Sequence, residues 1–242
     1  MSALPTLVLV LPLAACGGDS DTEPELTVLA ASSLTDVYQE LATGFEEDNQ
    51  AEVSFSFGSS TDLAEQAADG APGDVLSTAD ETSMNAAEDA GVAGEVVEFA
   101  TNVMVIVTPA GNPAGVESLD DLEGATWVRC ADEVPCGRVA GAVLEDNGVT
   151  AEPASLEEDV RSTLDKVVSG EADAGLVYAS DAVAAGEDVE TVEIPGAEEE
   201  LTTYFTTTLE QSDDPDLAQA WVDLVTSEEG RAALTEAGFT LP

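Results

Sequence analysis

Two serine-rich turns, each leading from an apolar strand pattern into a helical pattern, constrain the fold of this chain most. The first turn, residues 30–36, follows an apolar run at 26–30, and the second, residues 57–63, follows an alternating run at 53–57. A turn of this kind directs backbone N–H groups and hydroxyls toward one place, at the positive end of a helix dipole. The pattern therefore suits an anion, although the same serines also suit ordinary helix capping, with capping-box spacing after Ser33.

Strand and helix patterns continue to alternate along the chain, which predicts an α/β fold. Apolar runs at 102–107 and 175–178 are typical of buried strands. The chain has 242 residues, of which 44% are hydrophobic, so it is long enough for one large or two small domains and is not typical of a disordered protein.

Two further helix starts resemble the serine turns in position. A Pro-Cys-Gly start lies at 135–137, and another helix starts at 159–160. Tyr178 stands at the carboxyl end of its strand, where it adds a hydroxyl donor. Because ligands of open α/β sheets bind beyond the carboxyl ends of the strands, we expect these groups to meet in one crevice.

The chain is extremely acidic and contains no histidine. Asp and Glu number 51 against 5 Lys and Arg, which gives a net charge of −46 and makes nucleic acid and anionic membrane surfaces poor partners. The acids are spread along the chain, which is typical of a salt-adapted (halophilic) protein because salt screens self-repulsion. Since histidine is the usual general base and the commonest metal ligand, we expect no enzyme activity and no direct cation site.

The first residues are typical of a targeting segment. An apolar run at 4–13 is too short to span a bilayer and leads to a cysteine, which resembles a bacterial lipoprotein signal with Cys16 as the lipidated residue. We expect a signal peptide at 1–15, an acidic tether at 16–25, and export to the outer face of the cytoplasmic membrane. Residues 1–5 lack the basic residues of a usual signal. The alternative is a buried apolar strand with a chance cysteine.

Cys130 and Cys136 are six positions apart. In an exported protein such a pair favours a disulfide, which would stabilise the fold by roughly 2 kcal/mol through the chain entropy of the closed loop. A metal-binding pair and two free thiols are the alternatives.

Six segments together resemble the periplasmic molybdate-binding proteins of ABC transporters, which are type II solute-binding proteins. They lie in order at 30–35, 57–64, 134–138, 158–161, 175–182 and 237–239. The resemblance covers about residues 26–242 and implies two α/β lobes joined by two crossing strands, with an oxyanion in the cleft between the lobes. The expected lobes are residues 26–101 plus 204–242, and residues 102–203.

The resemblance also implies a set of ligand donors. They are the hydroxyl and N–H groups of Ser33 and Ser60, the backbone N–H groups of Cys136 and Val160, and the hydroxyl of Tyr178. Ser33 is chosen over Ser32 because it directly precedes leucine, and Ser60 is chosen over Ser59 by counting from Phe57. Such neutral donors hold a dianion without a counter-charge, provided that every lone pair finds a donor.

The implied function is the capture of molybdate or tungstate by a lipid-anchored monomer, without a cofactor, and its delivery to an ABC transporter permease. Molybdate and tungstate are nearly identical in size and charge, so the sequence does not separate them. The alternatives are a receptor of the same fold for another anion such as sulfate, an extracellular hydrolase that uses Ser33 or Ser60, and an acidic surface adhesin. The absence of histidine counts against the hydrolase.

Three of the basic residues, Arg129, Arg138 and Arg161, lie in or beside these segments. They either offset the acidic background near the ligand or form ordinary ion pairs with neighbouring acids such as Glu157 and Glu158.

Overall fold

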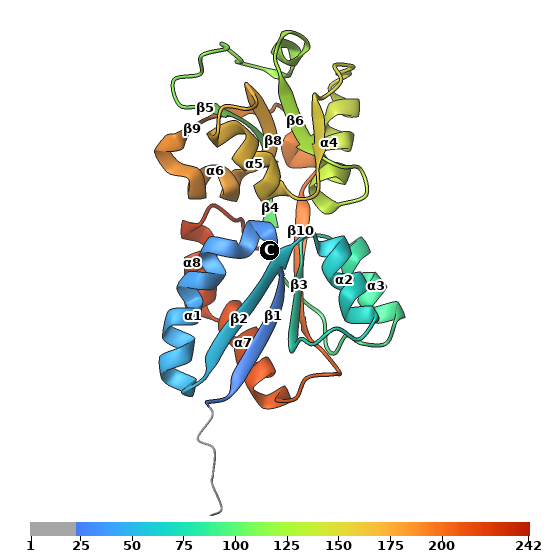
Figure 1. The fold of residues 1–242 in the computed structure, drawn as a ribbon, viewed down its shortest axis with the longest axis vertical. Coiled ribbons are helices and arrows are strands. Elements are labelled where there is room, and N and C mark those ends of the chain that lie inside the picture. Colours follow the sequence, from blue (N-terminus) through green and yellow to red (C-terminus); the bar gives the residue numbers. More distant parts are fainter. Residues whose placement is uncertain (1–22) are drawn as a thin grey trace, which may run out of the picture.

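The fold is built on two five-stranded sheets, seen in a computed structural model that describes residues 23–242. The predicted signal peptide and Cys16 lie outside the described residues. Within the described part of the chain, no helix is long and apolar enough to cross a membrane. In Figure 1 one sheet lies above the other, and β10 descends from the region between them into the lower sheet.

The first sheet has the order β2-β1-β3-β10-β4. Its strands are Glu52–Gly58, Glu25–Ala31, Val75–Thr78, Thr202–Thr208 and Val97–Asn102, in that order. β1 pairs in parallel with β2 and β3, and β10 pairs antiparallel with β3 and β4. Because the parallel strands all end at the same edge, the turns that follow β1 and β2 lie side by side.

Helices cover both faces of the first sheet (Figure 1). One face carries α1 (Thr35–Asn49), α7 (Pro215–Thr226) and α8 (Glu228–Glu236), and the other carries α2 (Ser60–Ala68) and α3 (Glu81–Asp89). Alternate residues of β1 pack into two different buried clusters, with Val28 on one face and Leu29 on the other. Burial on both faces explains why β1 is a nearly continuous apolar run.

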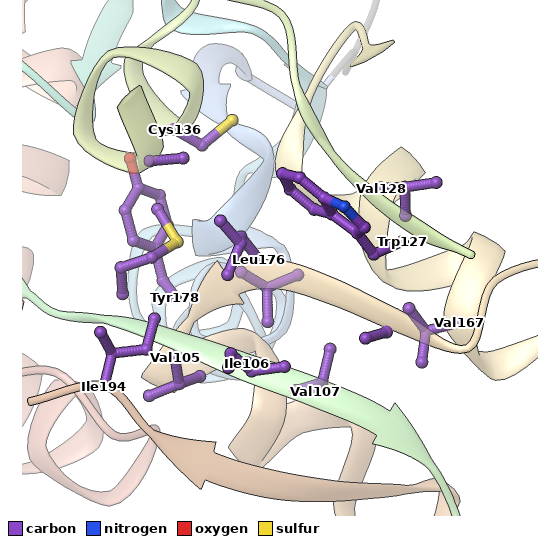
Figure 2. Close-up of a cluster of buried hydrophobic side chains, with 14 of the residues drawn as sticks. Val105, Ile106, Val107, Trp127, Val128, Cys136, Val167, Leu176, Tyr178 and Ile194 are labelled. Atoms are coloured by element: carbon purple, nitrogen blue, oxygen red, sulfur yellow. The ribbon is translucent and has the colours of Figure 1, made fainter. Parts of the chain in front are cut away.

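The second sheet has the order β7-β6-β8-β5-β9. Its strands are Ser155–Glu157, Trp127–Cys130, Ala174–Tyr178, Met104–Pro109 and Val189–Glu193, in that order. Its helices are α4 (Pro135–Asp146), α5 (Val160–Val168) and α6 (Ala179–Ala185). Figure 2 shows part of the core around this sheet, where Trp127, Leu176 and Val107 are buried.

The chain passes between the sheets twice. It leaves the first sheet after β4 and enters the second at β5, with only Val103 between the two strands. It returns after β9 through the short 3-10 turn Ala197–Glu199 and enters β10. The buried clusters keep to one sheet each, since the cluster of the second sheet runs from Met104 to Ala197.

Sequence patterns recover the central strands and the long helices but overlook three strands at sheet edges. These are β4, β7 and β9, which each stand at the end of a sheet and have exposed positions. An edge strand of this kind carries no continuous apolar run, so periodicity does not reveal it. A 3-10 helix, Leu119–Gly124, lies before β6.

Trp221 on α7 is the centre of the first core. It is fully buried, and its ring makes T-shaped contacts with Tyr38, Phe45 and Phe55.

We expect Trp221→Ala to lower the free energy of unfolding by about 3–5 kcal/mol, because it leaves a large cavity. Trp221→Phe should cost less, because it keeps an aromatic ring there and removes an indole N–H that has no partner among the described residues. Chemical denaturation of both variants checks the order, and equal losses would contradict it.

Candidate functional site

A small cavity lies where the carboxyl ends of strands from both sheets meet. Its volume is about 20 Å³, and on the same measure one water molecule needs about 10–15 Å³. The cavity therefore has room for one compact ligand. All the predicted donors border it, namely Ser33, Ser60, Cys136, Val160 and Tyr178, and Ser32, Ser59 and Asp159 border it too. The structure therefore brings together groups that are up to 145 positions apart along the chain (from Ser33 to Tyr178).

Ser33 does not cap the helix that follows it. It lies in the 3-10 turn Ser32–Leu34, and no side chain caps this turn or α1, so the capping-box prediction is wrong. The Ser33 Oγ atom instead lies 2.8 Å from the hydroxyl of Tyr204 on β10. Burial raises the pKa of Tyr204 far above its usual value, so that hydroxyl keeps its proton. When Tyr204 donates to Ser33, the Ser33 proton is left for a ligand.

Two adjacent serines begin α2 at the cavity. Ser60 Oγ accepts a hydrogen bond from the Ala79 N–H at 2.9 Å, which leaves its own proton for a ligand. Ser59 occupies the N-cap position, but its side chain makes no capping bond, and its buried Oγ has no partner among the described residues. Counting from Phe57 selected Ser60 alone. The N-cap position of Ser59 was the signal that it faces the same cavity.

Tyr178 brings a phenol to the site from the end of β8. Its ring is buried, and its hydroxyl makes no hydrogen bond of normal geometry within the described part of the chain. Burial, and then the neighbouring Tyr204, raise the pKa of Tyr178 well above its usual value, although the nearby Thr202 hydroxyl acts in the opposite direction. A buried, protonated hydroxyl of this kind needs an acceptor, and an anion in the cavity would supply one.

Two helix N-termini of the second sheet point backbone donors at the cavity. α4 begins at Pro135 and places Cys136 in its first turn, while α5 begins at Val160. The first N–H groups of a helix have no partner within it and so are available to a ligand. Gly137 allows the start of α4 to pack closely, since a Cβ there would lie 1.7 Å from the Ala131 carbonyl oxygen.

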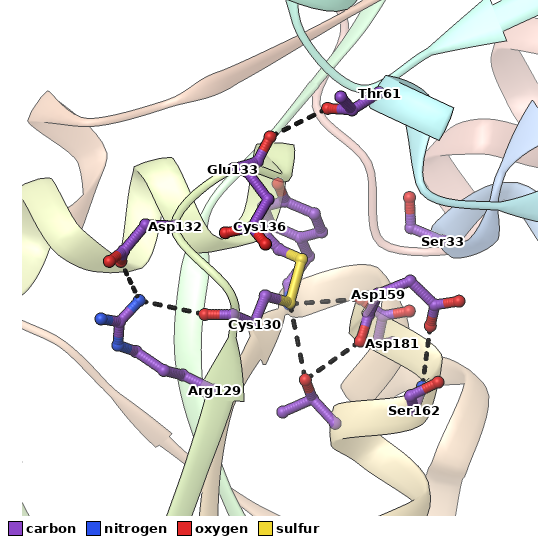
Figure 3. The surroundings of a disulfide bond; sticks show 12 residues. Ser33, Thr61, Arg129, Cys130, Asp132, Glu133, Cys136, Asp159, Ser162 and Asp181 are labelled. Carbon is purple, nitrogen blue, oxygen red and sulfur yellow. Dashed lines mark hydrogen bonds and ion pairs between the residues drawn. A yellow bond between two sulfur atoms is a disulfide. The ribbon is translucent and has the colours of Figure 1, made fainter. Parts of the chain in front are cut away.

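A disulfide joins Cys130 to Cys136 and so ties the end of β6 to the first turn of α4 (Figure 3). The Cys130 sulfur also lies 3.5 Å from the hydroxyl of Thr163, which donates to the Asp159 carbonyl at 3.1 Å. The disulfide thus stands between the starts of α4 and α5 and braces both donor turns. No group of three or more metal-ligating side chains occurs in residues 23–242.

The carboxylates near the cavity are turned toward other partners. Asp159 Oδ1 caps α5 by accepting from the Ser162 N–H at 2.8 Å. Asp181 is fully buried, accepts from the Tyr178 N–H at 3.2 Å, and lies 2.9 Å from Arg161 Nε. Burial raises the pKa of Asp181 from 3.8 to about 7, and the positive charge of Arg161 offsets this only in part.

The arginines near the site pair with aspartates rather than with Glu157 or Glu158. Arg129 pairs with Asp132, as Figure 3 shows. Arg138 pairs with Asp80, and Arg161 pairs with Asp36 and Asp181. The ordinary ion pairs that were one of the two expectations are therefore present, and Arg129 uses a near neighbour in the sequence, but Arg138 and Arg161 use carboxylates distant in the sequence in place of Glu157 and Glu158.

Known proteins share both the sequence and the fold of this chain. The family model of bacterial extracellular solute-binding proteins matches residues 26–240. The molybdate-binding protein ModA of Mycobacterium tuberculosis strain H37Rv is 36% identical over 254 residues, which cover all of this chain and 97% of that protein. A second relative, the molybdate-binding protein ModA of Escherichia coli K12, is 34% identical over 72% of this chain and 73% of that protein.

Solved structures of anion-binding proteins have the same architecture. The periplasmic molybdate-binding protein of Azotobacter vinelandii has a TM-score of 0.80 at 22% identity, covering 90% of this chain and 99% of that one. The sulfate-binding protein SubI of M. tuberculosis has a TM-score of 0.77 at 19% identity, covering 90% and 86%. These likenesses confirm the predicted two-lobed α/β fold.

The buried carboxyl group of Asp181 makes stability depend on pH. Its raised pKa means that the folded state holds a proton that the unfolded chain releases, so its contribution is lost as pH rises from about 4 to about 7. The test compares the free energy of unfolding of wild type with that of Asp181→Asn. Over this pH range the wild-type value should fall relative to that of the variant, by up to about 1.4 kcal/mol per pH unit. Denaturant titrations at several pH values check this, and a constant difference would contradict it.

The disulfide gives a second prediction. Reduction should lower the free energy of unfolding by roughly 2 kcal/mol, because the loop between the cysteines gains chain entropy when unfolded. Unfolding curves with and without a phosphine reductant measure the loss. A Cys130→Ala/Cys136→Ala variant is the control, since it should not respond to the reductant. If the free energy of unfolding of wild type is also unchanged by the reductant, the disulfide does not have this stabilising role.

Proposed function

The chain belongs to the bacterial extracellular solute-binding proteins, and from that premise we propose that it captures molybdate between its lobes and delivers it to an ABC transporter permease. The observation that carries the proposal is the convergence of neutral donors on one small cavity. The serine hydroxyls there do not cap helices, and the Tyr178 hydroxyl is buried without a partner in the described region. The relatives named above, which are called molybdate-binding proteins, support the choice of anion.

We assign five residues as ligand donors. They are Ser33, Ser60, Cys136, Val160 and Tyr178, and Ser59 is a further hydroxyl at the same cavity. Fixed N–H and O–H donors suit a fully ionised oxyanion, because each of its oxygens only accepts hydrogen bonds. A protonated anion would place its own O–H donor against a donor of the site, so one hydrogen bond could not form and binding would be weaker.

Tungstate belongs to the same proposal, since its size and charge match those of molybdate. Sulfate is the second candidate, because the sulfate-binding protein SubI has the same fold. Sulfate is smaller than molybdate and would leave some of the fixed donors unsatisfied. We therefore expect molybdate and tungstate to bind alike and sulfate to bind more weakly.

The location and the domain organisation of the protein belong to the same proposal. We infer export by the signal at 1–15 and anchoring through a lipid on Cys16, which leaves a monomeric binding unit at the outer face of the membrane. The two lobes would be residues 26–101 plus 204–242 and residues 102–203, in keeping with buried clusters that do not mix between the sheets. The 51 acidic residues support adaptation to high salt, where their repulsion is screened.

Calorimetric titration at high salt tests the function. Molybdate and tungstate should each bind with one site per chain, and Ser33→Ala should weaken binding roughly ten- to hundredfold, because a hydrogen bond to a charged ligand is lost. Ser54→Ala is the matched control, since that hydroxyl bonds Glu25 on the surface. Tighter binding of sulfate would favour the second candidate. Binding of neither molybdate nor tungstate, or a Ser33→Ala variant equal to the control, would refute the proposal.

A further inference from the structure

We propose that Arg138 and Arg161 hold the two lobes closed over the ligand and so slow its release. Each arginine follows one of the backbone donors of the second lobe, Cys136 or Val160, by one or two positions, and each pairs with an aspartate of the first lobe. The inference rests on the proposed capture function, because it assigns to these two residues the retention of that ligand.

Arg138 closes one side of the cleft. Its Nε donates to Asp80 Oδ2 at 2.9 Å, and its terminal nitrogen pairs with the same carboxylate. The two side chains are only 31% and 16% exposed, so the pair is partly withdrawn from solvent. Beside it, the Thr61 hydroxyl donates at 3.0 Å to the Glu133 carbonyl (Figure 3). Arg138 also contacts this carbonyl. The turn that carries Ser60 is thereby connected to the turn that carries Cys136.

Arg161 closes the opposite side in the same manner. Its terminal nitrogen lies 2.5 Å from Asp36 Oδ2, and Asp36 stands three positions after Ser33. The turn that carries Ser33 is thereby connected to the turn that carries Val160. Each ion pair thus joins one donor turn of the first lobe to one donor turn of the second, next to the cavity but outside the set of donors.

The charge of the chain gives these pairs their importance. Only 5 of the 242 residues are basic, and two of the five span the cleft. Closure brings two acidic bodies together, and their mutual repulsion opposes it. A positive charge from the second lobe that meets a carboxylate of the first reverses this repulsion locally. Arginines placed elsewhere on the second lobe would not have that effect at short range.

The two ion pairs differ in what remains when the lobes separate. Arg161 would keep its contact with Asp181, which belongs to the same lobe. Arg138 would lose Asp80, along with the hydroxyls of Thr61 and Ser83 that lie 3.4 Å from it. Asp36 is also 57% exposed, so salt screens its pair with Arg161 more strongly than it screens the Asp80 pair. We therefore expect Arg138 to contribute more to closure.

A pulse-chase experiment measures retention directly. Isotopically labelled molybdate is bound to the full chain and chased with unlabelled molybdate at low and at molar salt. We expect Arg138→Gln to speed dissociation about fivefold at low salt, equivalent to about 70% of the free energy of a tenfold change, and Arg161→Gln to speed it less. The effect should shrink at molar salt, where the Debye length falls to about 3 Å.

A double-mutant cycle separates the cross-cleft pair from general damage. Asp80→Asn removes the charge but keeps a good N-cap for α3, since Asn caps as well as Asp. The double variant Asp80→Asn/Arg138→Gln should release molybdate no faster than the faster single variant. Lys166→Gln is the control, because it removes one positive charge and an ion pair with Glu171 inside one lobe. Its dissociation rate should equal that of wild type.

Scattering of the ligand-free protein supplies a readout that does not depend on molybdate. Arg138→Gln should have a larger radius of gyration than wild type or Lys166→Gln at low salt. If molybdate does not bind but this expansion is seen, the closure role stands and the capture function fails. If molybdate binds but Arg138→Gln matches Lys166→Gln in both release rate and size, or if the cycle is additive, the closure role is wrong.

Discussion

The proposed anion site depends on neutral hydrogen-bond donors that the fold holds in place around one cavity. Strands from both sheets end at one cavity of about 20 Å³, and the helices that follow begin there. Their first N–H groups have no partners within the helices, and the serine side chains that could have capped two of the helices are turned elsewhere. Because these donors are held by strand ends, helix starts and a disulfide, they need little rearrangement to meet an anion.

One tyrosine and a main-chain amide bond to two serine hydroxyls of the cavity. The Tyr204 hydroxyl pairs with Ser33, and the Ala79 N–H donates to Ser60. A serine hydroxyl that accepts a hydrogen bond keeps its own proton for the cavity, as Ser60 does and as Ser33 does when Tyr204 donates to it. Tyr178 reaches the same cavity without an intramolecular partner in the described residues. The first lobe thus supplies hydroxyls and the second lobe supplies N–H groups and a phenol.

The acidity of the chain explains the sparing use of positive charge. A guanidinium among the donors would bind many anions, whereas donors fixed in a small cavity select by size and protonation state. The few arginines are placed around the cavity, on carboxylates such as Asp80 and Asp36. Asp181 shows the cost of this arrangement, since burial raises its pKa to about 7 despite the adjacent Arg161.

The sequence by itself determined the α/β class, the central strands and the turns that carry the donors, because strand and helix periodicities and turn residues are local properties. It did not determine the edge strands β4, β7 and β9, or that Ser33 pairs with Tyr204 instead of capping its helix. It also did not identify Ser59 as a cavity residue or the aspartates that accept Arg138 and Arg161. These features join residues far apart in the chain, either within one sheet, as Ser33 and Tyr204 do, or across the two sheets, as Arg138 and Asp80 do, so only tertiary packing decides them.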